Sequence, residues 1–179
     1  MRRRRSASVV AVMFAVVMLA VAVSMAGCDG SATGPRVPPG ADALSSSHVL
    51  EGDLLFHYRH YSGYRERQRL VIRTAAAWSE AWTRITGPSD PLRPPPAIDF
   101  DHEMVVLVSM GERATGGYSI AIEGVYDASG RIFAEVREKS PGAGCFVTEA
   151  VTRPVDAVRV PRRDSAVIFV ERAETVDCR

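Results

Sequence analysis

The sequence predicts an α+β domain made mostly of antiparallel β-sheet, with about seven strands and one short amphipathic helix. Several segments alternate apolar and polar residues, which is typical of strands with one buried face. Glycine-rich turns separate these segments, and one segment alone carries apolar residues at helical spacing. The stretch from Val49 to Cys178 holds about 130 residues, which is enough for one hydrophobic core.

A β-hairpin is the first expected element. Leu54, Phe56 and Tyr58 alternate with residues 55, 57 and 59, and Y-S-G-Y at 61–64 offers a turn. Residues 65–73 alternate again, so they are expected to form the second strand of this hairpin.

A short helix is expected next. The Thr74 hydroxyl can cap its first turn, and Gly87-Pro88 can end it. Its apolar face consists of Ala75, Trp78, Trp82 and Ile85. We interpret the tryptophans as core anchors, and the alternative is a platform for a ligand.

The remaining strands follow a proline-rich stretch, residues 88–96, that cannot form regular structure. Met104 to Met110 is continuously apolar, which predicts a strand at the centre of the sheet. D-A-S-G at 127–130 is a strong turn signal between two alternating segments. The expected strands of this part are residues 104–110, 118–123, 132–137, 155–160 and 166–171.

The N-terminal segment has the pattern of an export signal. Four arginines are followed by fifteen apolar residues from Val9 to Val23, and Ala26-Gly27 directly precede Cys28. The segment therefore resembles the lipobox of bacterial lipoproteins, which implies cleavage before Cys28, a lipid on that cysteine, and a lipid-anchored location in the cell envelope. The alternatives are an uncleaved transmembrane anchor, which needs about 18 to 25 apolar residues, and an ordinary secreted protein.

Three regions follow from this pattern: a signal peptide at 1–27, a lipidated cysteine with a disordered tether at 28–48, and one domain at 49–179. The tether is rich in glycine, proline and serine. Removing the signal changes 22 basic against 21 acidic residues to 18 against 21, a net charge near −3. A net charge near −3 does not indicate the basic surface that nucleic-acid binding requires.

The cysteine count also fits export. If Cys28 carries lipid, Cys145 and Cys178 remain, and two thiols of a small exported domain are expected to form a disulfide. The alternative is two separate buried thiols.

The sequence contains no recognisable catalytic set, so we expect no enzyme, no cofactor and no metal. His57 and His60 are three apart, and on a strand they would face opposite sides. The carboxylates of Asp99, Asp101 and Glu103 surround His102; we interpret them as a polar start to a strand, with a cation site as the alternative. Nucleophile-elbow and phosphate-loop motifs are absent from the sequence.

The most distinctive loop is G-E-R-A-T-G-G-Y-S-I, residues 111–120. One of its glycines, Gly116 or Gly117, is expected to have positive φ. Tyr118 should share a buried face with Ile120 and Ile122, which makes the loop a structural turn. The alternative is a binding loop formed by Thr115, Gly116, Gly117 and Tyr118.

Two longer stretches resemble the PrcB family of protease complex subunits. They are D-F-D-H-E-M-V-V-L-V-S-M-G-E-R-A-T-G-G-Y-S-I-A-I and P-G-A-G-C-F-V-T-E-A-V-T-R-P-V-D-A-V-R-V-P. The similarity is to the C-terminal domain of that family, from about Met104 to Val160. It implies an exported, noncatalytic accessory protein whose partner is another envelope protein, such as a surface protease.

Two other functions stay open. A-T-G-G-Y at 114–118 resembles the N-P-T-T-G-Y loop of chagasin-like cysteine-peptidase inhibitors, without the Asn-Pro pair. An inhibitor of that kind should place T-G-G-Y and P-G-A-G at one exposed end of the sheet. A small-molecule-binding lipoprotein would instead need a pocket lined by Trp78, Trp82 and Phe133.

Overall fold

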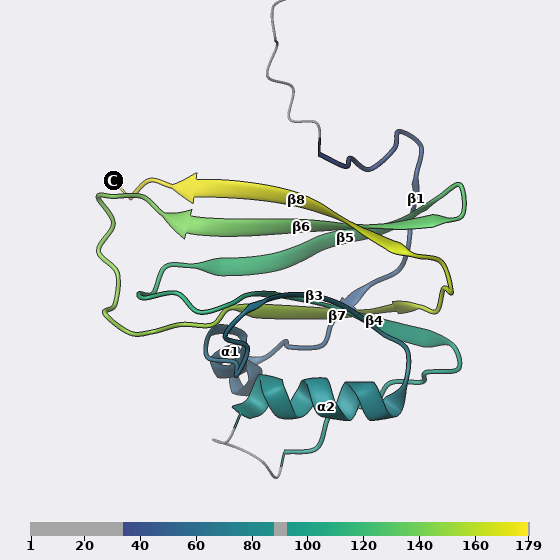
Figure 1. The fold of residues 1–179 in the computed structure, drawn as a ribbon, viewed down its shortest axis with the longest axis horizontal. Helices are drawn as coiled ribbons and strands as arrows, with labels where there is room; N and C mark the ends of the chain where they lie inside the picture. The colour runs from purple at the N-terminus through teal and green to yellow at the C-terminus, as the bar shows by residue number, and fades with distance from the viewer. Residues whose placement is uncertain (1–33, 88–92, 179) are drawn as a thin grey trace, which may run out of the picture. The chain divides into compact units, whose positions relative to one another are not determined.

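A computed structural model describes residues 34–87 and 93–178, which form two β-sheets and two helices (Figure 1). The expected signal peptide, Cys28 and residues 88–92 lie outside the described residues. None of the described helices is long and apolar enough to cross a membrane.

The strands form two sheets of four. The β5–β6 sheet contains, in order, β1 (Asp42–Ala43), β5 (Ser119–Ala128), β6 (Arg131–Pro141) and β8 (Val167–Val176). The β4–β7 sheet contains β2 (Ser47–His48), β7 (Val155–Pro161), β4 (Glu103–Met110) and β3 (Arg67–Ile72). Neighbouring strands are antiparallel except β6 and β8, which are parallel.

The domain has three layers, with the β4–β7 sheet between the β5–β6 sheet and the helices α1 (Asp53–His60) and α2 (Ala75–Thr86) (Figure 1). The mostly-β, α+β class is confirmed. The described residues contain eight strands where about seven were expected, because β1 and β2 have two residues each and leave no periodic pattern. A second helix is also present, and the single expected sheet is two.

β4 confirms the expected central strand, because β3 and β7 pair with its two edges. Val105 and Leu107 pack in the core between this sheet and the helices, whereas Val106 and Val108 pack in the core between the two sheets. Alternate strand residues point to opposite faces, so a strand covered on both faces needs apolar residues at every position.

α2 forms as the sequence predicts. The Thr74 side chain accepts a hydrogen bond from the Ala77 N–H at 3.2 Å, and Gly87, with φ 62°, ends the helix. Trp78 and Trp82 are buried against the β4–β7 sheet, which confirms that they are core anchors. Their indole N–H groups donate to the carbonyl oxygens of Pro96 and Arg93.

The prediction that residues 54–59 form the first strand of a hairpin is wrong, because residues 53–60 form the helix α1. Leu55 and Tyr58 both pack against the core beneath the β4–β7 sheet. Residues three apart share one face of a helix but lie on opposite faces of a strand, so this burial requires a helix. His57 and His60 are therefore also helical, which removes the strand geometry used to separate them.

Part of the expected tether belongs to the fold. β1 pairs with Asp127 and Tyr126 of β5, and β2 pairs with Arg159 and Val158 of β7. Leu44, between them, donates its N–H to the Val125 carbonyl and packs in the core between the sheets. The ordered domain therefore begins before residue 49, the boundary expected from composition.

Asp156 ties the two sheets together from the start of β7. Its side chain is fully buried, and its Oδ2 accepts a hydrogen bond from the Ile122 N–H of β5 at 2.9 Å. This donor lies at an irregularity in the β5–β6 register between Ile122 and Gly124. Asp156 Oδ1 lies 3.0 Å from His48 Nδ1 and 3.7 Å from Arg59, so a buried carboxylate is paired from two sides.

This pairing makes stability depend on pH through His48. The hydrogen bond to Asp156 raises the pKa of His48 above 6.5, against the opposing effects of burial and of Arg59. The folded state therefore binds the His48 proton more tightly than the unfolded state does. The resulting stabilisation is complete below pH 6.5 and is lost as the pH rises through the higher folded-state pKa.

We predict that His48→Gln reduces the free energy of unfolding more at pH 5.5 than at pH 9, since glutamine keeps a donor but carries no charge. Urea unfolding of the wild type and the variant across this pH range measures the difference between their free energies of unfolding. Both proteins contain the other histidines, so the contributions of those residues cancel in this difference. A difference that stays constant with pH would contradict the assignment.

Candidate functional site

Three segments meet at one end of the domain, at the left of Figure 1: the β4–β5 loop, the β6–β7 loop and the residues that follow β8. The β4–β5 and β6–β7 loops are joined by backbone hydrogen bonds. Arg113 and Thr152 exchange N–H to carbonyl bonds at 2.8 and 2.9 Å, and the Gly116 N–H donates to the Thr148 carbonyl at 2.9 Å. The end of α1 joins them, because the Arg153 N–H donates to the His60 carbonyl at 2.7 Å.

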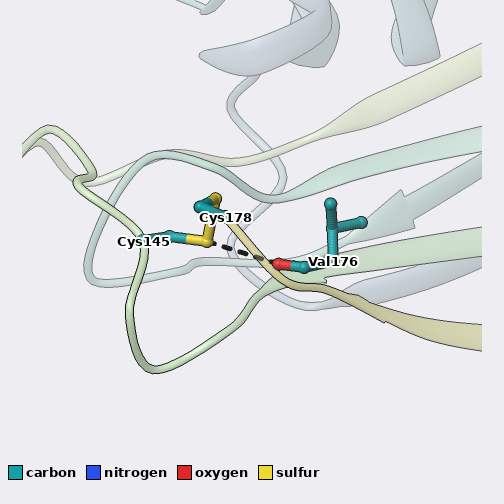
Figure 2. The surroundings of a disulfide bond; sticks show 3 residues. All are labelled: Cys145, Val176 and Cys178. Carbon is teal, nitrogen blue, oxygen red and sulfur yellow. Dashed lines mark hydrogen bonds between the residues drawn. A yellow bond between two sulfur atoms is a disulfide. The ribbon is translucent and has the colours of Figure 1, made fainter.

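The expected disulfide joins Cys145 of the β6–β7 loop to Cys178 after β8 (Figure 2). The Cα atoms are 4.9 Å apart and the residues are 33 positions apart in the chain. A cross-link of this span contributes roughly 3 to 4 kcal/mol in the chain-entropy account. The Cys145 Sγ lies 3.3 Å from the Val176 carbonyl oxygen, a close contact since a disulfide sulfur carries no proton.

The T-G-G-Y segment lies against the β6–β7 loop. Gly117 has φ 84°, which confirms the expected positive φ at this glycine pair. A Cβ at Gly117 would lie 2.9 Å from the Val147 side chain and 3.0 Å from that of Pro141, and one at Gly116 would overlap the Thr148 hydroxyl. The glycines therefore let the two loops approach closely.

Tyr118 is half-buried and packs against the core between the sheets, on the side of Ile120 and Ile122. The Arg113 guanidinium lies 5.8 Å from its ring centroid. The ring is thus less enclosed than the sequence predicts. It borders an open pocket of about 330 Å³ whose lining includes Tyr61, Thr148 and Thr152.

The large apolar side chains that are most exposed in the described part of the chain gather at this end: Tyr61, Phe146, Val151 and Val176. We call the surface formed by these four residues and the T-G-G-Y segment (115–118) the loop face. Sequence periodicity missed the four residues because they lie in loops or at strand ends. The sequence does contain one signal for an exposed residue: Phe146 directly follows a cysteine in a glycine-rich segment.

His60 lines the pocket of the loop face. Burial lowers its pKa from 6.5, and the positive charge of Arg59 and the nearby His57 lower it further. Its imidazole is therefore mainly uncharged at neutral pH, and the pocket offers a neutral polar group there.

The other candidate sites have simpler roles. The His102 Nδ1 lies 2.9 Å from a carboxylate oxygen of exposed Asp99, in a polar turn that precedes β4. No group of three or more metal-binding side chains occurs within the described ranges. The small-molecule-binding alternative needs a pocket lined by Trp78, Trp82 and Phe133. The structure does not bring these residues together, because the tryptophans lie between the β4–β7 sheet and the helices and Phe133 lies on β6 of the other sheet.

The geometry describes a disulfide-tied α+β domain that presents apolar side chains on loops at one end. Residues 104–161 match the family model described as PrcB C-terminal. This confirms the resemblance to the PrcB family for the segment from β4 to β7, which includes both loops of the loop face. Neither a curated protein nor a solved structure matches the chain.

We predict that Gly117→Ala destabilises the domain by about 2 to 4 kcal/mol. Positive φ costs alanine roughly 1 to 2 kcal/mol, and overpacking against Val147 and Pro141 adds a similar amount. Gly130→Ala is the matched control, because Gly130 has φ 76° but a methyl group added there would meet no atom within 4 Å. Equal losses in urea unfolding would show that the contact between the loops has no energetic role.

Proposed function

We propose that this protein is a noncatalytic accessory protein that binds another protein of the bacterial cell envelope through the loop face. The observation that carries the proposal is the gathering of exposed apolar side chains, above all Phe146, Val151 and Tyr61, at one end of the domain. Contiguous exposed apolar residues on a soluble domain are typical of protein-binding surfaces, and aromatic residues are enriched at their centres.

A surface protease is the partner that the resemblance to protease complex subunits supports. The matched segment contains the T-G-G-Y segment, Phe146 and Val151, so the likeness covers these parts of the loop face, while Tyr61 and Val176 lie outside it. A noncatalytic role is supported by the lack of catalytic motifs in the sequence and by the disulfide, which removes the Cys145 thiol as a nucleophile.

The rigidity of the loops also favours binding. The disulfide and the bonds from Gly116 to Thr148 and from Arg113 to Thr152 hold the β6–β7 loop at several points. A surface that is already ordered loses less conformational entropy when it binds.

We predict that a photo-crosslinking amino acid at Tyr61 or Val151 captures a defined envelope protein in intact cells. The control position is Arg131, which is exposed at the β5–β6 turn, at the opposite end of β6 from the loop face (Figure 1). Immunoblots should show the adduct from the loop face alone. The same adducts from Arg131, or none from either loop-face position, would refute docking through this surface.

Membrane attachment through Cys28 is part of the proposal, and the lipobox-like M-A-G-C segment supports it. We predict that the mature protein begins at Cys28 and carries a diacyl or triacyl addition. Intact-mass spectrometry of the membrane fraction measures this, with Cys28→Ser as the unlipidated control. Retention of residues 1–27, or an unmodified Cys28, would rule out this mode of attachment.

Peptidase inhibition is a second candidate, favoured by the meeting of T-G-G-Y and P-G-A-G at one end of the domain, as the chagasin-like arrangement requires. Gly116 is buried and bonded to Thr148, so T-G-G-Y supports the β6–β7 loop, which is the more prominent of the two. Assays of papain with the purified protein test this candidate.

A further inference from the structure

Phe146 is the most prominent side chain of the loop face. Its exposure is 106% of the reference value, so its whole ring is accessible to a partner. The residues on either side, Cys145 and Val147, are less exposed. A single apolar side chain therefore projects from a short stretch whose neighbours point back towards the domain.

Both neighbours of Phe146 are held in place. On the N-terminal side, Cys145 is bonded to Cys178, and its N–H donates to the Gly142 carbonyl at 3.0 Å. On the C-terminal side, Val147 lies close to Gly117, and the Thr148 carbonyl accepts from the Gly116 N–H. The T-G-G-Y segment thus supports the stretch that presents Phe146.

The stretch around Phe146 is an irregular loop segment. Residues 145–148 belong to no helix or strand, and none of the four has positive φ. The Cys145 N–H and the Thr148 carbonyl bond within the domain, whereas Phe146 and Val147 between them belong to no sheet ladder. Backbone groups outside a ladder are the ones that a partner strand can bind.

Building on the proposed docking function, we propose that residues 145–148 form a substrate-like inhibitory loop for a serine peptidase with an aromatic specificity pocket. Phe146 enters that pocket, which in chymotrypsin is a hydrophobic slot. The Phe146–Val147 peptide bond then lies at the catalytic serine. The held loop favours tight binding, because little conformational freedom is lost on association.

The disulfide gives this loop resistance to cleavage. Attack by the serine transfers the Phe146 acyl group to the enzyme and frees the Val147 amine, and hydrolysis consumes one water and leaves a Phe146 carboxylate. Cys145 lies before the cut bond and Cys178 after it, so the two fragments stay covalently joined. β4 and β7, and β6 and β8, also pair across the cut. The Val147 amine therefore stays near the acyl group and can re-form the bond.

The test uses the full chain, extracted in detergent, with chymotrypsin and a chromogenic substrate. The wild-type protein should inhibit competitively, and Phe146→Ala should weaken inhibition by roughly 30-fold or more, the effect of losing a central anchor residue. Arg131→Ala is the control, an exposed residue at the opposite end of β6 from the loop face, and should retain inhibition. Phe146→Arg should transfer inhibition from chymotrypsin to trypsin.

Electrophoresis adds a readout that folding defects do not imitate. After long incubation, a cut between Phe146 and Val147 should separate two fragments only under reducing conditions. Reduction of the disulfide before incubation should turn the protein into a rapidly digested substrate. Rapid digestion of the oxidised protein without inhibition would overturn the proposal, as would equal inhibition by wild type and Phe146→Ala.

These outcomes separate this inference from the docking function on which it rests. Adducts from Tyr61 and Val151 without chymotrypsin inhibition would refute the inhibitory loop and leave docking supported. Papain, assayed in parallel, decides the cysteine-peptidase candidate independently.

Discussion

The double burial of β4 is the constraint on which the rest of the structure depends. Its odd-numbered residues, such as Val105 and Leu107, need the helices that cover one face of its sheet, and its even-numbered residues need the second sheet. A single sheet with one helical face would leave half of this strand in water, at a cost of roughly 1.5 to 3 kcal/mol for each large apolar side chain. The three-layer arrangement follows from this strand.

Covering both faces of the β4–β7 sheet also requires a connection between the sheets, which Asp156 supplies. It occupies an inward position of β7, where an apolar residue would be the usual choice, and it satisfies the Ile122 N–H at the irregularity in β5. His48 and Arg59 then neutralise the buried charge from β2 and α1. The short strand β2 is thereby tied to the core, although its two residues form little sheet.

The elements that could be predicted from sequence are those in which local pattern and packing agree. β4 was predictable from its unbroken apolar run, α2 from Thr74 and Gly87, and the position of the left-handed residue from the glycine pair. α1 was not, because Leu54, Phe56 and Tyr58 alternate as on a strand while Leu55 and Tyr58 have helical spacing. In so short a segment only the shared burial of Leu55 and Tyr58 decides between the two. Phe146 was missed because exposure of one loop residue depends on contacts between distant segments.

The distribution of charge supports the proposed docking role of the loop face. Ion pairs between Arg137 and Glu123 and between Arg172 and Glu135 join strands of the β5–β6 sheet. At the edge where β3 approaches β8, Arg69 joins Glu138 and Glu171 across the gap between the sheets. The face of the β4–β7 sheet that points away from the β5–β6 sheet is covered by the helices. The charges at this edge disfavour edge-to-edge association, which supports the loops beside the disulfide as the proposed site of apolar contact.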